Sequence, residues 1–199
     1  MFENEIKRYN ALNDLAEQDG IVIFGGSEDV NIPLCELSQA FAIDAKLYNR
    51  SVKGISIKEA ISVYDACIAS LNPDTVLLHI GEADLKYFLE NATDFDRKYR
   101  ELIGHIKKQN KNCRIAIISL KNYDEAEDVA EMNKHLKYIS ESEHCEFGDI
   151  RTKLVWNPKG TKDVVSFVHN MGFVRPLKNK HPIYDLVKIL FCFDHASIA

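Results

Sequence analysis

Short apolar runs alternate along this chain with longer segments in which apolar residues recur at helical spacing, and this alternation decides the class of fold. The apolar runs predict buried strands at residues 21–24, 46–48, 75–80 and 114–120, with a fifth strand at 147–150 or 153–156. Strands that alternate with helices form βαβ units, which predicts a parallel sheet covered by helices on both faces. A chain of 199 residues is long enough for a single domain, which we expect to span 1–199.

The segments between the strands predict amphipathic helices. Ser56-Ile57-Lys58-Glu59 has the pattern of a capping box, in which the serine hydroxyl and the glutamate carboxylate bond free amides at a helix start. Apolar residues continue at helical spacing to residue 71, and further stripes cover residues 95–106, 129–139 and 183–191. The acidic run at 124–128 precedes one of these stripes, so we interpret it as a solvated helix start that complements the helix dipole.

Composition and charge exclude some classes of partner. The net charge of -5 and the isoelectric point near 5.8 argue against a nucleic-acid-binding protein, because neutralising phosphates takes clustered Lys and Arg. No apolar stretch approaches the roughly 20 residues that span a bilayer, so we expect no membrane partner. The first residues, Met1-Phe2-Glu3, lack the pattern of a secretory signal, which favours a cytoplasmic protein.

Five cysteines stand at positions 35, 67, 113, 145 and 192, an odd number without a Cys-x-x-Cys motif. Most lie in apolar runs, so we expect reduced core thiols, as in a cytoplasmic protein; a secreted form without its signal segment is the alternative. His144-Cys145 has no partners at metal-ligand spacing, and we therefore predict neither a metal nor another cofactor.

Polar and glycine-rich segments follow the predicted strands. In parallel sheets ligands bind at the carboxyl ends of the strands, which directs attention to these segments. They are Gly25-Gly26-Ser27-Glu28 after the first strand, Asn49-Arg50-Ser51-Val52-Lys53-Gly54 after the second, Gly81-Glu82-Ala83-Asp84 after the third, and Lys178-Asn179-Lys180-His181-Pro182 before the last helix.

Together, in this order and at these strand ends, the four segments resemble the sequence blocks of the SGNH hydrolases, the GDSL-type lipases and esterases. The resemblance extends from about residue 21 to residue 191. It implies an α/β fold with three layers, α/β/α, around a flavodoxin-like parallel sheet of five strands. It also implies that Ser27 is the nucleophile, that the backbone amides of Ser27 and Gly54 form the oxyanion hole, and that His181 is the catalytic base.

The sequence departs from the family pattern at four positions. Gly26 replaces the usual aspartate of the first block, and Ser51 replaces the first glycine of the second block. Ala83 stands where the family has an oxyanion-hole asparagine, and Lys178 stands where it has the acid of the triad. The two missing catalytic groups weaken the expectation of an intact serine hydrolase, since each contributes strongly to turnover.

Other residues of the blocks are expected to lie around the nucleophile. Glu82 or Glu28 can approach the site as a replacement acid or as a substrate contact. His169 is an alternative base, because Ser166-x-x-His169 resembles a degenerate form of the last block, whereas His79, inside a strand, is predicted to be a satisfied core histidine. The expected site-lining residues are Gly26, Glu28, Asn49, Glu82, Ala83 and Asp84.

Three functional hypotheses are compatible with these residues. The first, which we favour, is a serine ester hydrolase that acts through Ser27 and His181 on a small acyl or acetyl ester, for example on a carbohydrate. The second is a catalytically degenerate binding or accessory protein with the same fold. The third is a nucleotide- or flavin-binding protein that uses Gly25-Gly26-Ser27 as a phosphate loop, but the Gly-Lys-Ser/Thr ending and the Gly-x-Gly-x-x-Gly spacing are both missing.

Overall fold

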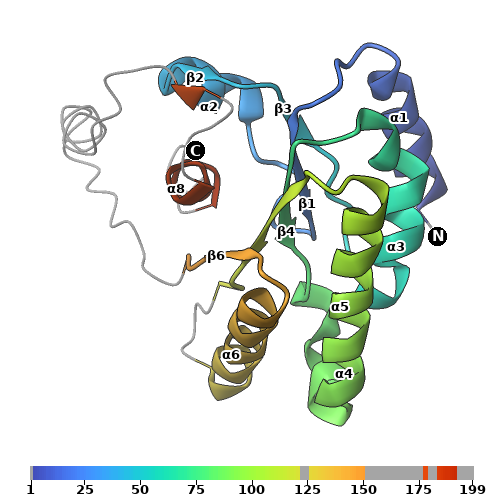
Figure 1. Cartoon of the computed structure of the whole chain (residues 1–199), viewed down its shortest axis with the longest axis vertical. Helices are drawn as coiled ribbons and strands as arrows, with labels where there is room; N and C mark the ends of the chain where they lie inside the picture. Colours follow the sequence, from blue (N-terminus) through green and yellow to red (C-terminus); the bar gives the residue numbers. More distant parts are fainter. Residues whose placement is uncertain (1, 122–125, 151–176, 179–182, 192–199) are drawn as a thin grey trace.

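Five parallel strands form the central sheet of the computed structural model, which describes residues 2–121, 126–150, 177–178 and 183–191 (Figure 1). The order of the strands across the sheet is β3-β1-β4-β5-β6, the flavodoxin-like order in which the second strand of the sheet lies outside the first. The strands are β1 (Ile21–Gly25), β3 (Leu47–Asn49), β4 (Thr75–His79), β5 (Arg114–Ile118) and β6 (Glu146–Gly148). A separate parallel pair joins β2 (Ile43–Asp44) to β7 (Leu177–Lys178).

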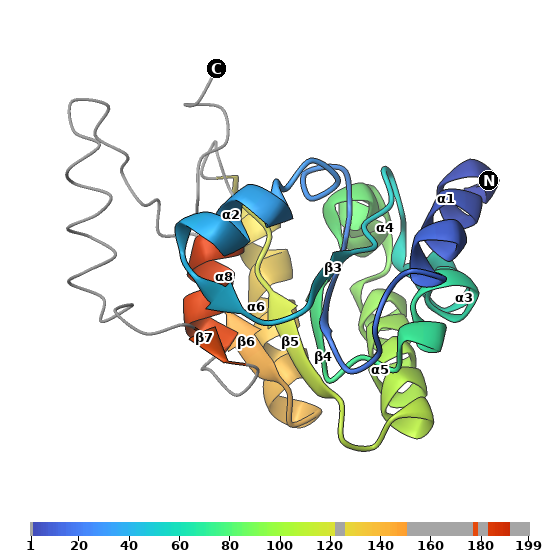
Figure 2. The ribbon, with the colours of Figure 1, turned by 90° about the horizontal axis from the view of Figure 1, so that it is seen from above.

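Helices connect the strands and cover both faces of the sheet (Figure 2). The α-helices are α1 (Glu3–Asn13), α2 (Leu34–Ala40), α3 (Ile57–Cys67), α4 (Leu85–Glu90), α5 (Ala92–Gln109), α6 (Glu127–Ser142) and α8 (Ile183–Phe191), with 3-10 turns η1 (Ala69–Leu71) and η2 (Glu82–Asp84). The predicted capping box is confirmed, because the Ser56 amide donates to Glu59 Oε2 at 3.3 Å where α3 begins.

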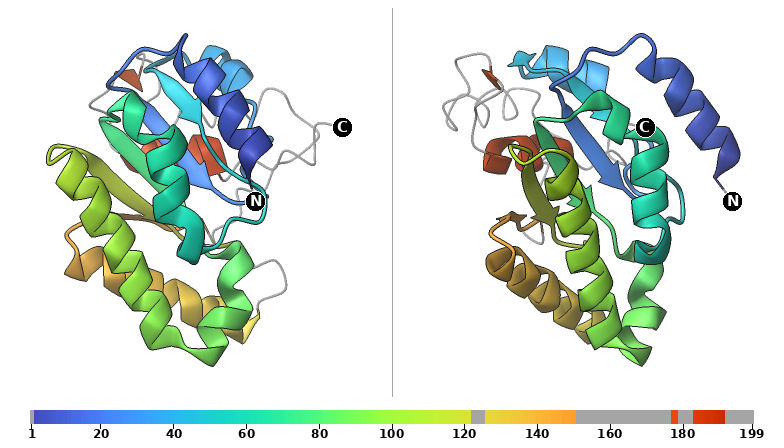
Figure 3. Two further views of the ribbon diagram at one scale, coloured as in Figure 1. Left: turned by 90° about the vertical axis from the view of Figure 1, so that its right-hand side faces the viewer. Right: turned by 45° about the vertical axis from the view of Figure 1, so that its right-hand side comes forward.

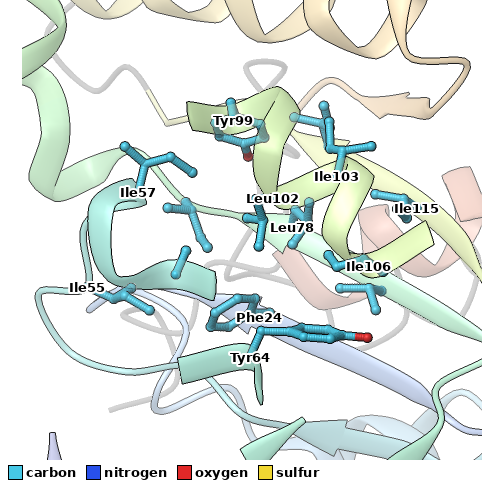
Figure 4. Packing of buried hydrophobic residues seen from close by; sticks show 14 of the residues in the cluster. Phe24, Ile55, Ile57, Tyr64, Leu78, Tyr99, Leu102, Ile103, Ile106 and Ile115 are labelled. Carbon is cyan, nitrogen blue, oxygen red and sulfur yellow. The ribbon is translucent and has the colours of Figure 1, made fainter. Parts of the chain in front are cut away.

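The core has two parts, one on each face of the sheet. Helices α1, α3, α4, α5 and α6 bury their apolar side chains against the larger part, which Figure 4 shows around Phe24, Tyr64 and Leu78. Figure 3 (left) looks onto this layer, with α1, α3 and α5 in front of the sheet. Helices α2 and α8 cover the opposite face, where Leu37 and Leu190 pack with Ile23 of β1. The predicted three-layer α/β/α architecture is confirmed.

Some predicted boundaries differ from the observed ones. The fourth predicted strand, 114–120, ends at Ile118. Beyond it, the side chain of Asn133 of α6 bonds the Leu120 backbone in place of a neighbouring strand: it accepts the Leu120 amide proton at 2.7 Å and donates to the Leu120 carbonyl at 2.9 Å. The fifth strand, Glu146–Gly148, overlaps the first of the two predicted segments, 147–150, and the other, 153–156, lies outside the described residues. Helices α1, α2 and α4 and the pair β2–β7 were not predicted.

The cysteines follow the prediction in part. Cys67 and Cys113 are free and buried, and burial raises the pKa of their thiols to about 11 and about 12. Cys145 is half-buried, whereas Cys35 is exposed on α2 and is therefore not a core residue. Cys192 lies outside the described residues. Among the described helices, none combines the length and the apolar composition that a bilayer-spanning segment needs.

Candidate active site

The neighbouring strands β1 and β4 lie at the point of the sheet where the strand order reverses. From β1 the chain passes to β3 on one side, and it then crosses to β4 on the other side. Their register pairs Gly25 with His79, so the loops after both strands leave the sheet at the same edge. This edge is the usual ligand site of such a sheet, and Ser27 and Glu82 both lie on these loops.

The amide of Gly54 points at the predicted nucleophile. It donates a hydrogen bond to Ser27 Oγ at 3.2 Å, and the Ser27 side chain is half-buried. Gly54 has φ +72°, a left-handed conformation that glycine adopts without the strain of a side chain. The loop that carries it is fixed to β1, because the amide of Val52 donates to the Gly25 carbonyl at 3.0 Å. The structure therefore brings together two of the residues that the sequence placed in one site.

Ser51 and Asn49 connect the loop after β3 to the segment that begins at Gly25. Ser51 is fully buried, and its hydroxyl accepts the amide proton of Gly25 at 3.1 Å, a bond that the family's glycine at this position has no side chain to make. Asn49 donates to the Asp29 carbonyl at 2.7 Å and accepts from the Ser51 amide at 2.9 Å. Asn49 thus joins the first block to the second block.

Glu82 lies directly on the nucleophile segment. Its Oε2 accepts the backbone amide proton of Ser27 at 2.9 Å, the amide that was predicted to serve the oxyanion hole. A Cβ atom at Gly26 would come within 2.8 Å of the same Oε2 atom. The departure from aspartate to glycine at position 26 therefore leaves the room that the Glu82 carboxylate uses.

A buried ion pair lies beside the nucleophile segment. The Nδ1 atom of His79 lies 2.9 Å from each carboxylate oxygen of Asp29. Both side chains are buried, Asp29 being 2% exposed and His79 4% exposed. The His79 ring packs edge-on against Phe191 of α8, and its Nε2 atom is buried with no hydrogen-bond partner among the described residues. The prediction of a core histidine is confirmed, although only one of its two nitrogens is satisfied within this part of the chain.

The His79–Asp29 pair makes a pH-dependent contribution to stability. Burial opposes protonation of the imidazole, but the Asp29 carboxylate outweighs burial, so the pKa of His79 is raised above its ordinary value of 6.5. A raised folded-state pKa gives stability that is complete below about pH 6.5 and is lost as the pH rises through the folded-state pKa. We expect the difference in free energy of unfolding between the wild type and His79→Gln, measured in urea, to be larger at about pH 6 than at about pH 9. An equal difference at both pH values would contradict this assignment.

The other acidic residues of the blocks have different surroundings. Asp84 turns inward, and its Oδ2 accepts the Ile57 amide proton at 2.9 Å where α3 begins; burial raises its pKa to about 6. Asp84 was predicted to line the site, and it instead anchors η2 to α3. Glu28 forms an ion pair with Lys121, which follows β5, at 3.4 Å, while Ala83 is exposed beside Glu82.

The predicted bases cannot be placed. His181 and His169 lie outside the described residues, and their roles remain predictions. Helix α8, which follows His181-Pro182, packs near the same edge of the sheet: Phe191 contacts His79 at the end of β4, and the Val187 side chain lies against Gly148 at the end of β6.

Sequence reasoning missed the contacts that join the loops. Asp29 and Lys121 were not predicted as neighbours of the site, because each acts through a partner distant in sequence. An acidic residue two positions after the nucleophile was the one available signal for Asp29. Within the described residues, no group of three or more His, Cys, Asp or Glu side chains is arranged to hold a metal ion.

Comparisons with known proteins agree with this architecture. No protein-family model and no curated protein matches the sequence. Among solved structures, a candidate platelet activating factor from Streptococcus pneumonia is 17% identical, with a TM-score of 0.65 over 86% of this chain and 89% of that chain. A GDSL-like lipase from Bacteroides thetaiotaomicron is 14% identical, with a TM-score of 0.59 over 84% and 96%. An acetylxylan esterase from Geobacillus stearothermophilus is 15% identical, with a TM-score of 0.51 over 68% and 78%. At such identities the likeness establishes a common fold.

Proposed function

The chain has the fold of the SGNH hydrolases, and we propose that it is a serine ester hydrolase acting on a small acyl or acetyl ester, for example on a carbohydrate. The observation that carries this proposal is the hydrogen bond from the Gly54 amide to Ser27 Oγ at 3.2 Å. It joins a half-buried serine to a backbone donor at the edge of the sheet where ligands of such folds bind. Esterases among the structural neighbours support ester hydrolysis as the chemistry of this fold.

The proposed reaction has two steps. Ser27 Oγ attacks the ester carbonyl, its proton passes to a base for which His181 is the candidate, and the C–O bond to the alcohol breaks as the alcohol takes that proton. Water then attacks the acyl-enzyme, releases the carboxylic acid and returns the proton to Ser27. The amides of Gly54 and Ser27 would donate to the oxygen that becomes negative in each step.

A specific observation favours a second candidate, a degenerate binding protein with the same fold. The carboxylate of Glu82 accepts the hydrogen bond of the Ser27 amide. The side chain of Ala83 has no hydrogen-bond donor to replace that of the family's asparagine. Loss of one oxyanion donor costs on the order of 10²–10³ in turnover. A protein of this kind would retain the site for binding and hydrolyse esters slowly or not at all.

Covalent labelling tests the proposed function. A fluorophosphonate probe reacts only with an activated serine, so we expect labelling of the wild type and none of Ser27→Ala, with hydrolysis of an activated acetyl ester lost in parallel. Ser62→Ala is the matched control, since Ser62 is an exposed serine on α3 whose hydroxyl donates to the Glu59 carbonyl. We expect this control to react like the wild type.

The two candidate functions give different results. Equal labelling of the wild type and Ser27→Ala, together with equal ester hydrolysis, would eliminate the hydrolase and leave the binding protein. Peptide mass spectrometry of the labelled wild type identifies the modified serine and excludes a reaction elsewhere on the surface.

A further inference from the structure

Glu82 accepts a hydrogen bond from the Ser27 amide, a donor that the proposed reaction needs. The Ser27 amide, one of two donors for the oxyanion in the proposed function, is taken by the Glu82 carboxylate at 2.9 Å. We propose that Glu82 is an inhibitory residue of this site, whose carboxylate competes with the acyl oxygen of the substrate for the Ser27 amide. This inference rests on the proposed function and names a residue that sets its rate.

The site is built around this contact. A Cβ atom at Gly26 would meet Glu82 Oε2 at 2.8 Å, and its next neighbours, at 3.8 and 3.9 Å, are also atoms of Glu82. The space that a side chain at position 26 would take is therefore filled by this one carboxylate. An aspartate at position 26, as in the family pattern, would both clash with Glu82 and repel it.

The charge of Glu82 opposes the reaction as well. Among the described residues it forms no ion pair within 4 Å, whereas the neighbouring Glu28 is paired with Lys121 at 3.4 Å. A carboxylate beside the acyl carbon repels the negative charge that develops there, which is the opposite of what an oxyanion hole provides. Substrate therefore has to displace Glu82 before the Ser27 amide can act.

The surroundings allow this displacement. Glu82 is exposed to solvent, so its side chain can exchange the amide for water. The backbone of η2 remains in place, because Asp84 anchors it through the Ile57 amide at 2.9 Å. Movement of one side chain is thus sufficient to open the site, and no part of the fold has to rearrange.

Three variants test the competition in different ways. Glu82→Ala removes the carboxylate, Glu82→Gln removes the charge but keeps an oxygen that can accept the amide proton, and Gly26→Ala pushes the unchanged carboxylate away. Glu90→Gln is the control, an exposed glutamate at the end of α4. The readouts are the rate of fluorophosphonate labelling at Ser27 and kcat/KM for an activated acetyl ester.

We expect Glu82→Ala and Gly26→Ala to raise both rates by about fivefold or more, the factor that corresponds to freeing one hydrogen-bond donor. Glu82→Gln should give a smaller rise, and Glu90→Gln should react like the wild type. Unchanged or lower rates in Glu82→Ala and Gly26→Ala, with Ser27-dependent reaction in the wild type, would overturn the inference and leave the proposed function intact.

The backbone amide resonance of Ser27 supplies a readout without catalysis. It should differ between the wild type and Glu82→Ala, because the variant lacks the carboxylate that accepts the Ser27 amide proton, whereas Glu90→Gln should leave it unchanged. A Ser27 resonance that is the same in the wild type and in Glu82→Ala would overturn the inference whatever the activities. If the contact is present but no variant reacts at Ser27, the proposed function fails, and the inhibitory role of Glu82 fails with it.

Discussion

Asp29→Ala is expected to lower the free energy of unfolding by about 3–5 kcal/mol near pH 6, the cost of removing one partner from a buried ion pair. The substitution leaves His79, 4% exposed, without the carboxylate that its Nδ1 atom contacts at 2.9 Å. The imidazole must then lose its proton or remain charged without a partner, and either change destabilises the folded state. Urea denaturation of the wild type and the variant measures the effect.

An exposed pair of the same residue types gives the matched control. Asp65 contacts His105 at 2.7 Å, with side chains 45% and 28% exposed, so Asp65→Ala should cost less than about 1 kcal/mol. The variant Asp29→Ala/His79→Ala should be less destabilised than the sum of its two single substitutions, because the pair is lost only once. Additive losses would show that Asp29 and His79 stabilise the fold independently.

Gly25 and Gly26 show how differently two adjacent glycines are constrained. A Cβ atom at Gly25 would lie 1.7 Å from an oxygen of Asp29, which the buried pair holds in place. A Cβ atom at Gly26 would meet only Glu82, an exposed side chain that can move. The first glycine is therefore required by the fold, and the second is required by the contact on Ser27.

The sheet and its principal helices could be predicted from the sequence because their signals are local. Buried parallel strands such as β4 and β5 are continuous apolar runs, and α5 buries a stripe of apolar residues at helical spacing. Helix α1 has no such stripe: Tyr9 is its one buried residue, and its hydroxyl donates to the Ser51 carbonyl at 2.5 Å. Asn13 of the same helix donates to the Cys67 carbonyl at 2.9 Å and accepts from Arg50 Nε at 2.9 Å. Periodicity of apolar residues does not detect a helix that depends on such polar contacts.

The sequence predicted which segments after the strands form the site, but not which side chains contact each other there. Three segments that follow strands contain Ser27, Gly54 and Glu82, and the structure joins these three residues by hydrogen bonds. The partner of each side chain was beyond prediction, because Glu82 lies 55 residues from Ser27 and His79 lies 50 residues from Asp29. Asp84 could not be recognised as an anchor of α3, since its partner Ile57 lies 27 residues away in the chain.

His181→Ala is expected to lower turnover of an activated acetyl ester by about 10²–10⁴, the usual contribution of a general base. The proposed reaction requires an acceptor for the Ser27 proton, and among the described residues Ser27 Oγ makes one hydrogen bond, in which it accepts from the Gly54 amide. The predicted base, His181, lies outside the described residues, and its position relative to Ser27 remains a prediction. Steady-state kinetics with the wild type as reference measures the loss.

His169→Ala distinguishes the two candidate bases and should change turnover less than twofold. A structural role for His181 is separated from a catalytic one by added imidazole, which should restore part of the activity of His181→Ala because it can take the Ser27 proton from solution. A large loss in His169→Ala with normal turnover in His181→Ala would reverse the assignment, and normal turnover in both variants would require a base other than either histidine.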